Sequence, residues 1–273
     1  MARYGLLADV HANLAALRAV LGRLERERLD GLVCAGDLVG YGPSPNECVE
    51  LLSRRGVLCV AGNHDLIASG RLDDASAGRT ARRSLVWTRA HLSDEVRDRL
   101  AALPLTAVTP DGVIVTHGAI DDPEARVVRP EGAVSAIAGL VARFPDACFL
   151  VVGNTHRPVA FDDQGRVPEG ARGGTLRLAP GRRYLINPGS VGQSREYRAW
   201  ARCAILDTAA LELRFVTVRY DRGETSRASV AAGLPPGAEH RPPYARWLAP
   251  RRLPHRFGSA LRRRLGRSVS GGG

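Results

Sequence analysis

The sequence predicts an α/β protein whose first strands are parallel. Three short apolar runs, Arg3 to Ala8, Leu32 to Ala35 and Val57 to Val60, are separated by segments with apolar residues at helical spacing. These segments are long enough to hold a helix in each crossover, as parallel neighbours require. Each run ends in polar residues, and open α/β sheets place their sites at the carboxyl ends of strands.

The remaining elements are predicted from periodicity and from turn residues. In chain order we predict helices over 14–28 and 46–54, a polar helical stretch over about 71–103, strands over 105–109 and 113–116, a helix over 131–143 and a strand over 148–152. From 159 to 219 short strands alternate with turns, which predicts an antiparallel meander. Because we find no internal repeat and no linker before about residue 234, we predict a single domain over 1–234.

Composition limits the class of protein. The chain has 273 residues, of which 44% are hydrophobic and 25% charged, as in soluble globular proteins. No apolar run reaches the roughly 18 residues of a membrane span, and no signal-like segment precedes the first strand, so the expected compartment is the cytoplasm. The five cysteines form no C-x-x-C pair, which favours buried free thiols over a disulfide framework or a zinc site.

Residues 235–273 are predicted to form a basic, flexible tail rich in Arg and Pro. Phe257, Leu261 and Leu265 recur at every fourth residue beside several arginines, a pattern that suits a helix on an anionic surface. The tail could therefore bind nucleic acid or an anionic membrane. A solvated tail without a partner is the simpler interpretation of the same composition, and we favour it.

Polar clusters follow five of the strand-like runs. They are Asp9-Val10-His11, Gly36-Asp37, Gly62-Asn63-His64-Asp65, Thr116-His117-Gly118 and Gly153-Asn154-Thr155-His156. A single cluster of this kind would indicate a turn or a helix N-cap. Four of the seven histidines fall within these clusters, however, and five separate structural explanations would be needed. Carboxylate, amide and imidazole groups are together suited to a pair of divalent cations, which can neutralise a phosphate, generate hydroxide and stabilise a leaving oxygen.

In their order, the five clusters resemble those of the calcineurin-like metallophosphoesterase superfamily, most of all its small bacterial phosphodiesterases. The resemblance covers about residues 3–219. It implies a four-layer α-β-β-α sandwich of two mixed sheets with a dimetal site at the strand ends. It also implies a metal-dependent hydrolase of phosphoric esters, with Mn²⁺ expected and Fe, Mg²⁺, Ni²⁺ or Zn²⁺ as alternatives.

The resemblance also assigns roles to residues. The implied metal ligands are Asp9, His11 and His156 at one cation, Asn63 and His117 at the other, and Asp37 as the bridge. Asn63 and His64 would contact the substrate. His64 would not bind a metal, but would protonate the leaving group or hold a phosphate oxygen, and Asp65 would orient its ring.

Position 154 departs from the pattern of the superfamily, which has Gly-His-x-His where this chain has Gly153-Asn154-Thr155-His156. Three interpretations stay open. Asn154 binds the second metal through its amide oxygen, it holds a water on that metal, or the second site is weak. Because every other ligand position is filled, we favour an active enzyme.

The sequence leaves the substrate open. A small phosphodiester or phosphomonoester is expected, with specificity in loops 40–46, 66–80 and 119–130. Asn187-Pro188-Gly189-Ser190 could bind phosphate or form an ordinary turn, and Tyr41 is expected to pack on its own helix. The alternative function is a weakly active or inactive metal- and phosphate-binding adaptor that uses its basic tail.

Overall fold

The computed structural model describes residues 2–120, 122–168 and 174–234. The predicted tail, 235–273, and its expected anionic partners therefore lie outside the described residues, as do His240 and His255. Within the described residues, no helix combines the length and the apolar character needed to cross a membrane. Cys34, Cys48 and Cys203 are buried free thiols as predicted, whereas Cys148 is exposed.

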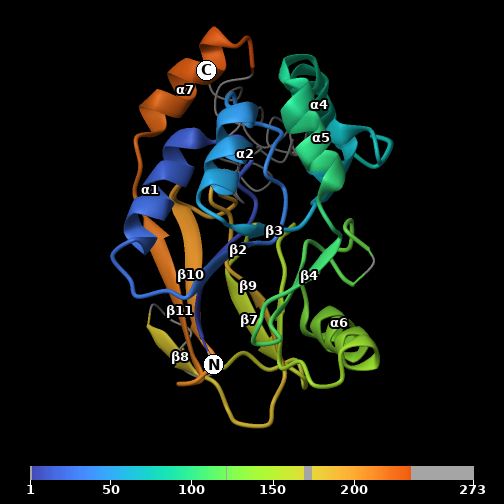
Figure 1. Cartoon of the computed structure of the whole chain (residues 1–273), viewed down its shortest axis with the longest axis vertical. Helices are drawn as coiled ribbons and strands as arrows, with labels where there is room; N and C mark the ends of the chain where they lie inside the picture. Colours follow the sequence, from blue (N-terminus) through green and yellow to red (C-terminus); the bar gives the residue numbers. More distant parts are fainter. Residues whose placement is uncertain (1, 121, 169–173, 235–273) are drawn as a thin grey trace, which may run out of the picture. The chain divides into compact units, whose positions relative to one another are not determined.

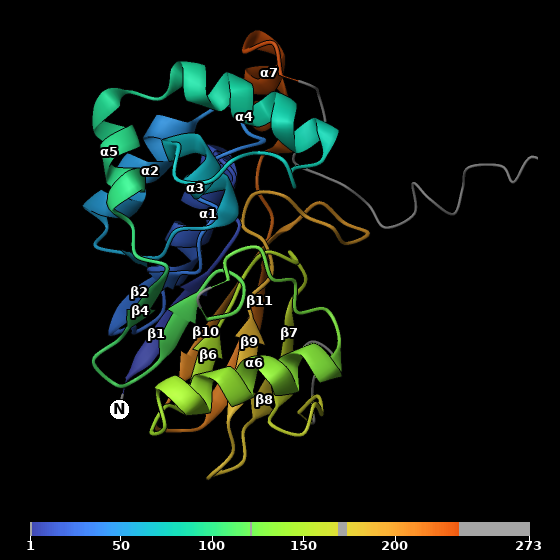
Figure 2. The ribbon, with the colours of Figure 1, turned by 90° about the vertical axis from the view of Figure 1, so that its right-hand side faces the viewer.

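Two mixed sheets pack face to face, and helices cover the outer face of each (Figures 1 and 2). The first sheet has the strand order β3 (Leu58–Cys59), β2 (Gly31–Cys34), β1 (Arg3–Leu7), β10 (Ala201–Asp207), β11 (Glu212–Val218) and β8 (Thr175–Arg177). The second has the order β4 (Thr106–Val108), β5 (Ile114–Thr116), β6 (Phe149–Val151), β9 (Tyr184–Asn187) and β7 (Val159–Asp162). The predicted α-β-β-α sandwich is confirmed.

Apolar side chains form three layers of core. Leu6, Val33, Val115 and Ile186 belong to the central cluster between the sheets. A second cluster lies under the helices of the first sheet, and a third under the helix of the second sheet. The helices are α1 (Leu14–Leu24), α2 (Pro45–Arg54), α3 (Asn63–Ser69), α4 (Arg79–His91), α5 (Asp94–Ala102), α6 (Pro130–Arg143) and α7 (Arg222–Ala231).

Parallel pairing brings the polar strand ends to one edge. In the first sheet β1 pairs in parallel with β2, and β2 with β3. In the second sheet β5, β6 and β9 are parallel to one another. Each predicted polar cluster follows one of these strands, so the strand-end residues of both sheets meet at a single site.

Three features differ from the sequence prediction. The stretch Asn63–Ser69 forms α3 directly after the third strand, where a loop was expected. The segment after 159 is not a simple meander, because β9 inserts between β6 and β7 and runs parallel to β6. All four residues of β9 are buried, as is typical of a parallel strand covered on both faces. The helix α7 was not predicted.

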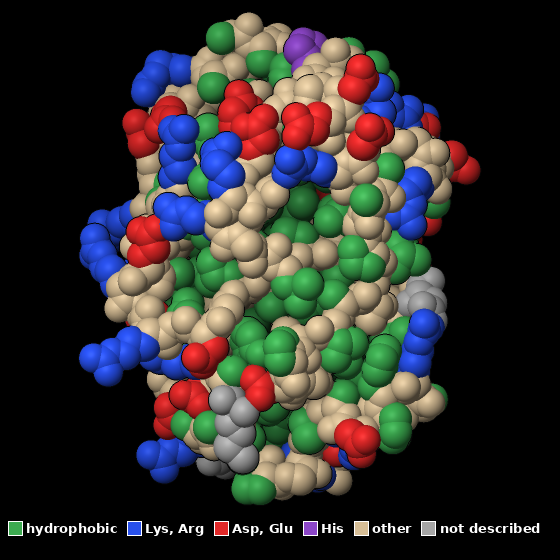
Figure 3. Space-filling model, in the orientation of Figure 1, with side chains coloured by type: hydrophobic (Ala, Val, Ile, Leu, Met, Phe, Trp, Pro, Cys, Tyr) green, Lys and Arg blue, Asp and Glu red, His purple; other side chains and the backbone are tan. Residues whose placement is uncertain are grey.

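One face of the molecule is apolar in its centre. Figure 3 shows apolar side chains gathered there, with charged side chains mainly over the helices and at the rim. A hollow of about 280 Å³ lined by Leu38, Val49, Leu52 and Leu103 belongs to the packing of α2 and α5 near β3. On the edge strand β4, Val108 is 51% exposed.

The loops that follow β2 and β3 approach each other so closely that only glycine fits between them. A Cβ at Gly62 would overlap the Oδ1 and backbone N atoms of Asp37. A Cβ at Gly36, whose φ is +81°, would lie 2.6 Å from the Gly62 nitrogen. These two glycines therefore set the distance between the Asp37 loop and the start of α3.

We expect Gly62→Ala to destabilise the fold by about 1–3 kcal/mol, because the added methyl group must displace backbone as well as a side chain. Urea denaturation measures this change in the free energy of unfolding. Gly22→Ala in α1 is the matched control, since a Cβ there meets no atom within 4 Å. That substitution should stabilise the fold by about 0.5–1 kcal/mol, the usual helix-interior difference. Equal stability of the two variants would contradict the close approach.

Candidate metal centre

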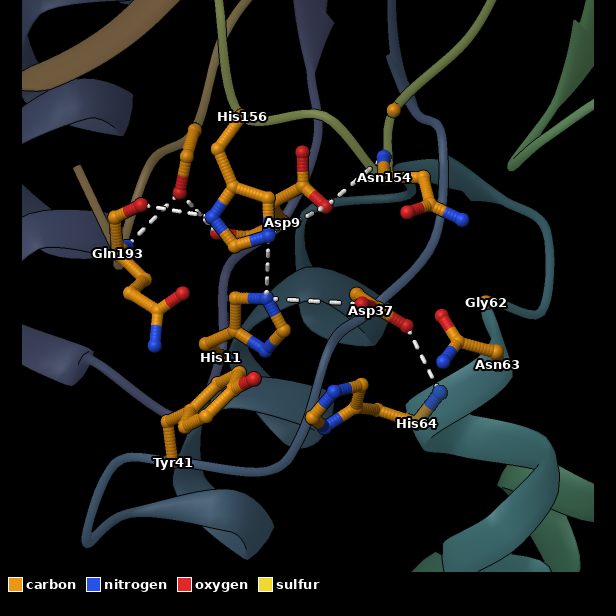
Figure 4. A network of polar contacts seen from close by, with 12 residues as sticks. Asp9, His11, Asp37, Tyr41, Gly62, Asn63, His64, Asn154, His156 and Gln193 are labelled. Carbon is orange, nitrogen blue, oxygen red and sulfur yellow. Dashed lines mark hydrogen bonds and ion pairs between the residues drawn. The ribbon is translucent and has the colours of Figure 1, made fainter. Parts of the chain in front are cut away.

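The strand ends bring the predicted ligands into one buried cluster. Figure 4 shows Asp9, His11 and His156 on one side of Asp37, with Asn63 and His64 on the other. One potential ligand atom from each of Asp9, His11, Asp37 and His156 lies within 4.8 Å of the others. All four residues are buried. This arrangement offers two carboxylates and two imidazoles to a single cation.

The cluster is built on strained backbone. Asp9, His11, Asp37, Asn154 and His156 all have positive φ, at 53°, 49°, 55°, 64° and 60°. Residues other than glycine seldom adopt this backbone conformation, which costs of order 1–3 kcal/mol per residue. Hydrogen bonds between the loops hold it in place, such as those from Asp9 N to Gly36 O and from His11 N to Asp37 O. The strain turns each side chain toward the centre.

Asp37 lies between two groups of ligands. Its Oδ2 is 3.5 Å from His11 Nε2 and 3.4 Å from His117 Nε2. The same His117 nitrogen is 3.2 Å from the Oδ1 of Asn63, which begins α3. One carboxylate oxygen therefore faces the histidines of both predicted sites, as the ligand that bridges two cations must.

Each of the three histidines is held by a backbone carbonyl. The Nδ1 atoms of His11, His117 and His156 lie 3.1, 2.6 and 2.7 Å from the carbonyl oxygens of Val39, Ala35 and Gln193, respectively. Such a carbonyl accepts the Nδ1–H and leaves the Nε2 lone pair directed at the centre. This is the outer contact that metal-binding histidines typically make.

The donor atoms are better suited to bind a cation than to contact one another. His11 Nε2 and His156 Nε2 are 3.3 Å apart. Burial lowers the pKa of His11 to about 3, and burial with the charge of Arg195 holds the pKa of His156 well below its usual range. Both Nε2 atoms therefore carry lone pairs that repel across a short distance. Asp9 Oδ2 is also buried without a hydrogen-bond partner among the described residues. A divalent cation would satisfy all three atoms.

The opposite half of the cluster also attracts positive charge. Burial alone would lower the pKa of His117, but Asp37 and Asp9 raise it to about 9. Burial likewise favours a protonated Asp37, yet the charge of His117 and its hydrogen bond hold the pKa of Asp37 well below the usual range. Burial raises the pKa of Asp9 to about 7. In the metal-free protein His117 is therefore protonated at neutral pH, and its positive charge lies beside Asp37, where a cation would bind.

Asp65 does not orient His64, which corrects the sequence prediction. Its Oδ1 accepts the N–H groups of Leu38 and Val39, and its Oδ2 accepts that of Gly62. Consecutive residues of α3 point in different directions around the helix, so these two side chains cannot face each other. Asp65 instead fixes the loop after Asp37 against the start of α3.

His64 lies beside the cluster and not within the group of four. Its backbone N–H donates to Asp37 Oδ1 at 2.9 Å, and its ring packs against the rings of His11 and Tyr41. Its Nδ1 has no hydrogen-bond partner within the described part of the chain. Burial lowers its pKa, so the ring is neutral at neutral pH.

Asn154 faces the same cavity as the histidines. Its backbone N–H donates to Asp9 Oδ1 at 3.0 Å, and its side-chain Nδ2 donates to Pro123 O at 3.2 Å. The second bond fixes the amide, and Figure 4 shows the amide oxygen on the side of Asp9. The carboxamide thus presents an acceptor toward the centre.

A cleft of about 330 Å³ opens onto the cluster. All three loops expected to determine specificity contribute to it, through Tyr41, through Ser76 to Gly78, and through Glu124 with Arg126. Tyr41 does not pack on its own helix as expected, because its ring lies edge-on to His11 and tilted against His64, with centroids 4.7 Å from each. The ring forms part of the cleft wall.

The sequence analysis considered only the start of the loop between β9 and β10, Asn187 to Ser190, and missed the later part that reaches the cleft. It supplies Gln193, whose carbonyl holds His156, and Arg195, which lines the cleft. The preceding turn is structural, because Ser190 Oγ donates to Asp9 O and Gly192 N also donates to Asp9 O. No polar cluster with a His or Asp marks this loop in the sequence, so no signal distinguished it from an ordinary turn.

Comparisons with known proteins agree with this geometry. The sequence pattern of the calcineurin-like phosphoesterase superfamily domain matches residues 3–210. An uncharacterized protein of Methanocaldococcus jannaschii is 32% identical over 234 residues, which are 84% of this chain and 93% of that protein.

Solved structures have the same fold. The crystal structure of a metallophosphoesterase from Sphaerobacter thermophilus has a TM-score of 0.71 and 35% identity, covering 85% of this chain and 95% of that one. A hypothetical protein from Pyrococcus horikoshii has a TM-score of 0.69 and 21% identity, covering 87% and 96% of the two chains.

We expect Asp37→Asn to lower the bound metal from two ions toward none. The substitution keeps the size of the side chain but removes the charge that faces both groups of histidines. Metal content after dialysis, measured by mass spectrometry, checks this. Asp98→Asn in α5 is the matched control, because Asp98 is exposed and far in sequence from the cluster.

A second readout of the same variant needs no metal. With the Asp37 charge removed, the His117 pKa should fall from about 9 toward or below its ordinary value of 6.5, because burial then dominates. A titration of the metal-free protein by nuclear magnetic resonance measures it. A His117 pKa that stays near 9, or two metals still bound, would rule out the central position of Asp37.

Proposed function

The chain belongs to the calcineurin-like phosphoesterase superfamily, and from this membership we propose that it is a dimetal-dependent phosphoesterase acting on a small phosphate ester. The superfamily and the related metallophosphoesterase structure support a hydrolase of phosphoric esters. The observation that carries the proposal is the single Asp37 oxygen placed 3.5 and 3.4 Å from the Nε2 atoms of two histidines.

We assign the residues that would hold the cations from the superfamily resemblance, and the cluster around Asp37 supports this assignment. Asp9, His11 and His156 would hold one ion, Asn63 and His117 would hold the other, and Asp37 would contact both; Asn154 would complete the second. When bound, the two cations neutralise phosphate charge and lower the pKa of water. The mixture of carboxylate, amide and imidazole donors favours Mn²⁺, with Fe, Mg²⁺, Ni²⁺ and Zn²⁺ as alternatives.

His64 is the residue that we assign to the leaving group. It lines the cleft next to Asn63, and both would contact the substrate phosphate. Its lowered pKa keeps the ring neutral in the free site, and an arriving anionic phosphate raises the pKa of a neighbouring histidine. The ring then takes up a proton from solvent and donates it to the departing oxygen. Tyr41 and His11 on its faces restrict its rotation.

The first test is hydrolysis of a panel of phosphodiesters and phosphomonoesters with Mn²⁺ supplied. Turnover that requires the metal and stops with a chelator supports the proposal, and the panel decides between diester and monoester. A chain that binds two metals but hydrolyses no member would favour the adaptor function instead.

We expect His64→Ala to keep both metals and to lower kcat by roughly 10²–10⁴-fold, the usual contribution of a general acid. Metal content and turnover are measured on the same preparation. The matched control is His91→Ala, because His91 is exposed on α4 and outside the cleft. Loss of a metal in the His64 variant would instead identify His64 as a ligand.

We expect Asn154→His to tighten the second metal if the carboxamide weakens that site, and activity then appears at lower Mn²⁺. Each tenfold gain in affinity corresponds to about 1.4 kcal/mol. Calorimetric titration with Mn²⁺ measures the affinity, and turnover is followed in parallel. If the metal tightens while the rate falls, Asn154 positions water or substrate. An unchanged titration would remove position 154 from the site.

A further inference from the structure

The cleft is lined by two arginines that the metal ligands do not explain. Arg126, from the loop between β5 and α6, and Arg195, from the loop between β9 and β10, both line it. The volume of about 330 Å³ lies within the range of small-molecule pockets, about 300–1,000 Å³. A substrate can therefore extend from the metal ligands to the two arginines.

Arg195 lacks a charged partner. Among the described residues its guanidinium makes one hydrogen bond, from Nη2 to the neutral Oε1 of Gln193 at 3.5 Å, and no ion pair. It is half-buried. Burial lowers its pKa and the nearby charge of Arg126 adds to this, whereas Asp9 and Asp37 oppose it. A half-buried guanidinium with so weak a partner retains most of its capacity to bind an anion.

Arg126 is likewise uncommitted. It is exposed, and within the described ranges it forms no hydrogen bond or ion pair. The acidic residue of the same loop that lines the cleft, Glu124, is engaged elsewhere, because its Oε1 accepts the hydroxyl of Ser76 across the cleft. Two guanidinium groups thus line one cavity, and neither forms an ion pair with a carboxylate among the described residues.

Like charges that converge on a cavity are unfavourable unless an anion binds between them. In the proposed function the scissile phosphate is held by Asn63, His64 and the cations. Guanidinium groups bind phosphate through paired, charge-assisted hydrogen bonds. The anion that pairs with the two arginines is therefore a further phosphate of the same substrate.

We propose that Arg126 and Arg195 bind a second phosphate adjacent to the scissile one, which makes the substrate an ester of a diphosphate or longer polyphosphate. The proposal rests on the proposed function only for the position of the scissile phosphate. It predicts that the chain discriminates between ligands that differ by one terminal phosphate.

The test is equilibrium binding of α,β-methylene ADP and of AMP to the full-length, Mn²⁺-loaded protein by calorimetry. The two ligands share the nucleoside, and the methylene bridge prevents turnover. We expect the diphosphate to bind at least ~10-fold more tightly, as charge-assisted hydrogen bonds usually give. Chelation of the metal by the diphosphate contributes equally to its affinity for every variant, so this contribution cancels when the variants are compared.

Arg195→Gln should remove the preference for the diphosphate, and Arg126→Gln should reduce it. Because Arg126 is exposed and forms no hydrogen bond or ion pair in the described ranges, its substitution should leave the fold intact, and this variant decides the matter if Arg195→Gln does not fold. Arg198→Gln is the matched control, since Arg198 belongs to the same loop but lies over the ring of Trp200. It should keep the full preference.

Two results would overturn the proposal. One is a wild-type protein that binds both ligands equally. The other is an equal loss of affinity for both ligands in the Arg195 variant, which would place its guanidinium on the scissile phosphate. Failure of the proposed function is read separately, from metal content and hydrolysis of bis(p-nitrophenyl) phosphate by the wild type, because ligand binding is measured without turnover.

Discussion

The position of the Asp37 carboxylate is the constraint on which the rest of the site depends. Its Oδ2 faces histidines that follow β1 and β5, and its Oδ1 accepts the N–H of His64 at the start of α3. Strands of both sheets must therefore end at one point. The absence of a side chain at Gly62 allows the Asp37 loop to come close enough. The sandwich thus acts as a frame that fixes the distance between two groups of ligands.

Stability and metal binding are coupled through this arrangement. The buried carboxylates and imidazoles and the residues with positive φ are costly, and the apolar cluster between the sheets offsets that cost. A cation that binds only the folded chain stabilises it further by mass action. The backbone carbonyls on His11, His117 and His156 hold the rings ready, so little reorganisation is needed when a metal arrives.

The cleft combines two kinds of chemistry. Oxygen and imidazole donors follow the ends of strands. Arginines and a tyrosine come from loops, and Tyr41 packs against His11 and His64. Loops vary more easily than strand ends, so under the proposed function the strand ends would carry the reaction and the loops would select the substrate. Glu124 and Ser76 link two of these loops across the cavity.

The sequence by itself predicted the parallel strands and the polar clusters at their carboxyl ends, and its resemblance to the superfamily implied the two-sheet sandwich and the ligand residues. The strands and the clusters depend on local pattern, since a polar residue directly after an apolar strand must lie at the sheet edge. Only the tertiary structure decided that Asp65 binds the loop after Asp37 instead of orienting His64, that β9 lies between β6 and β7, and that Arg195 reaches the cleft. These features depend on which distant segments meet. Neither the side chain's partner across the fold nor the order of strands in a sheet is marked by a local pattern in the sequence.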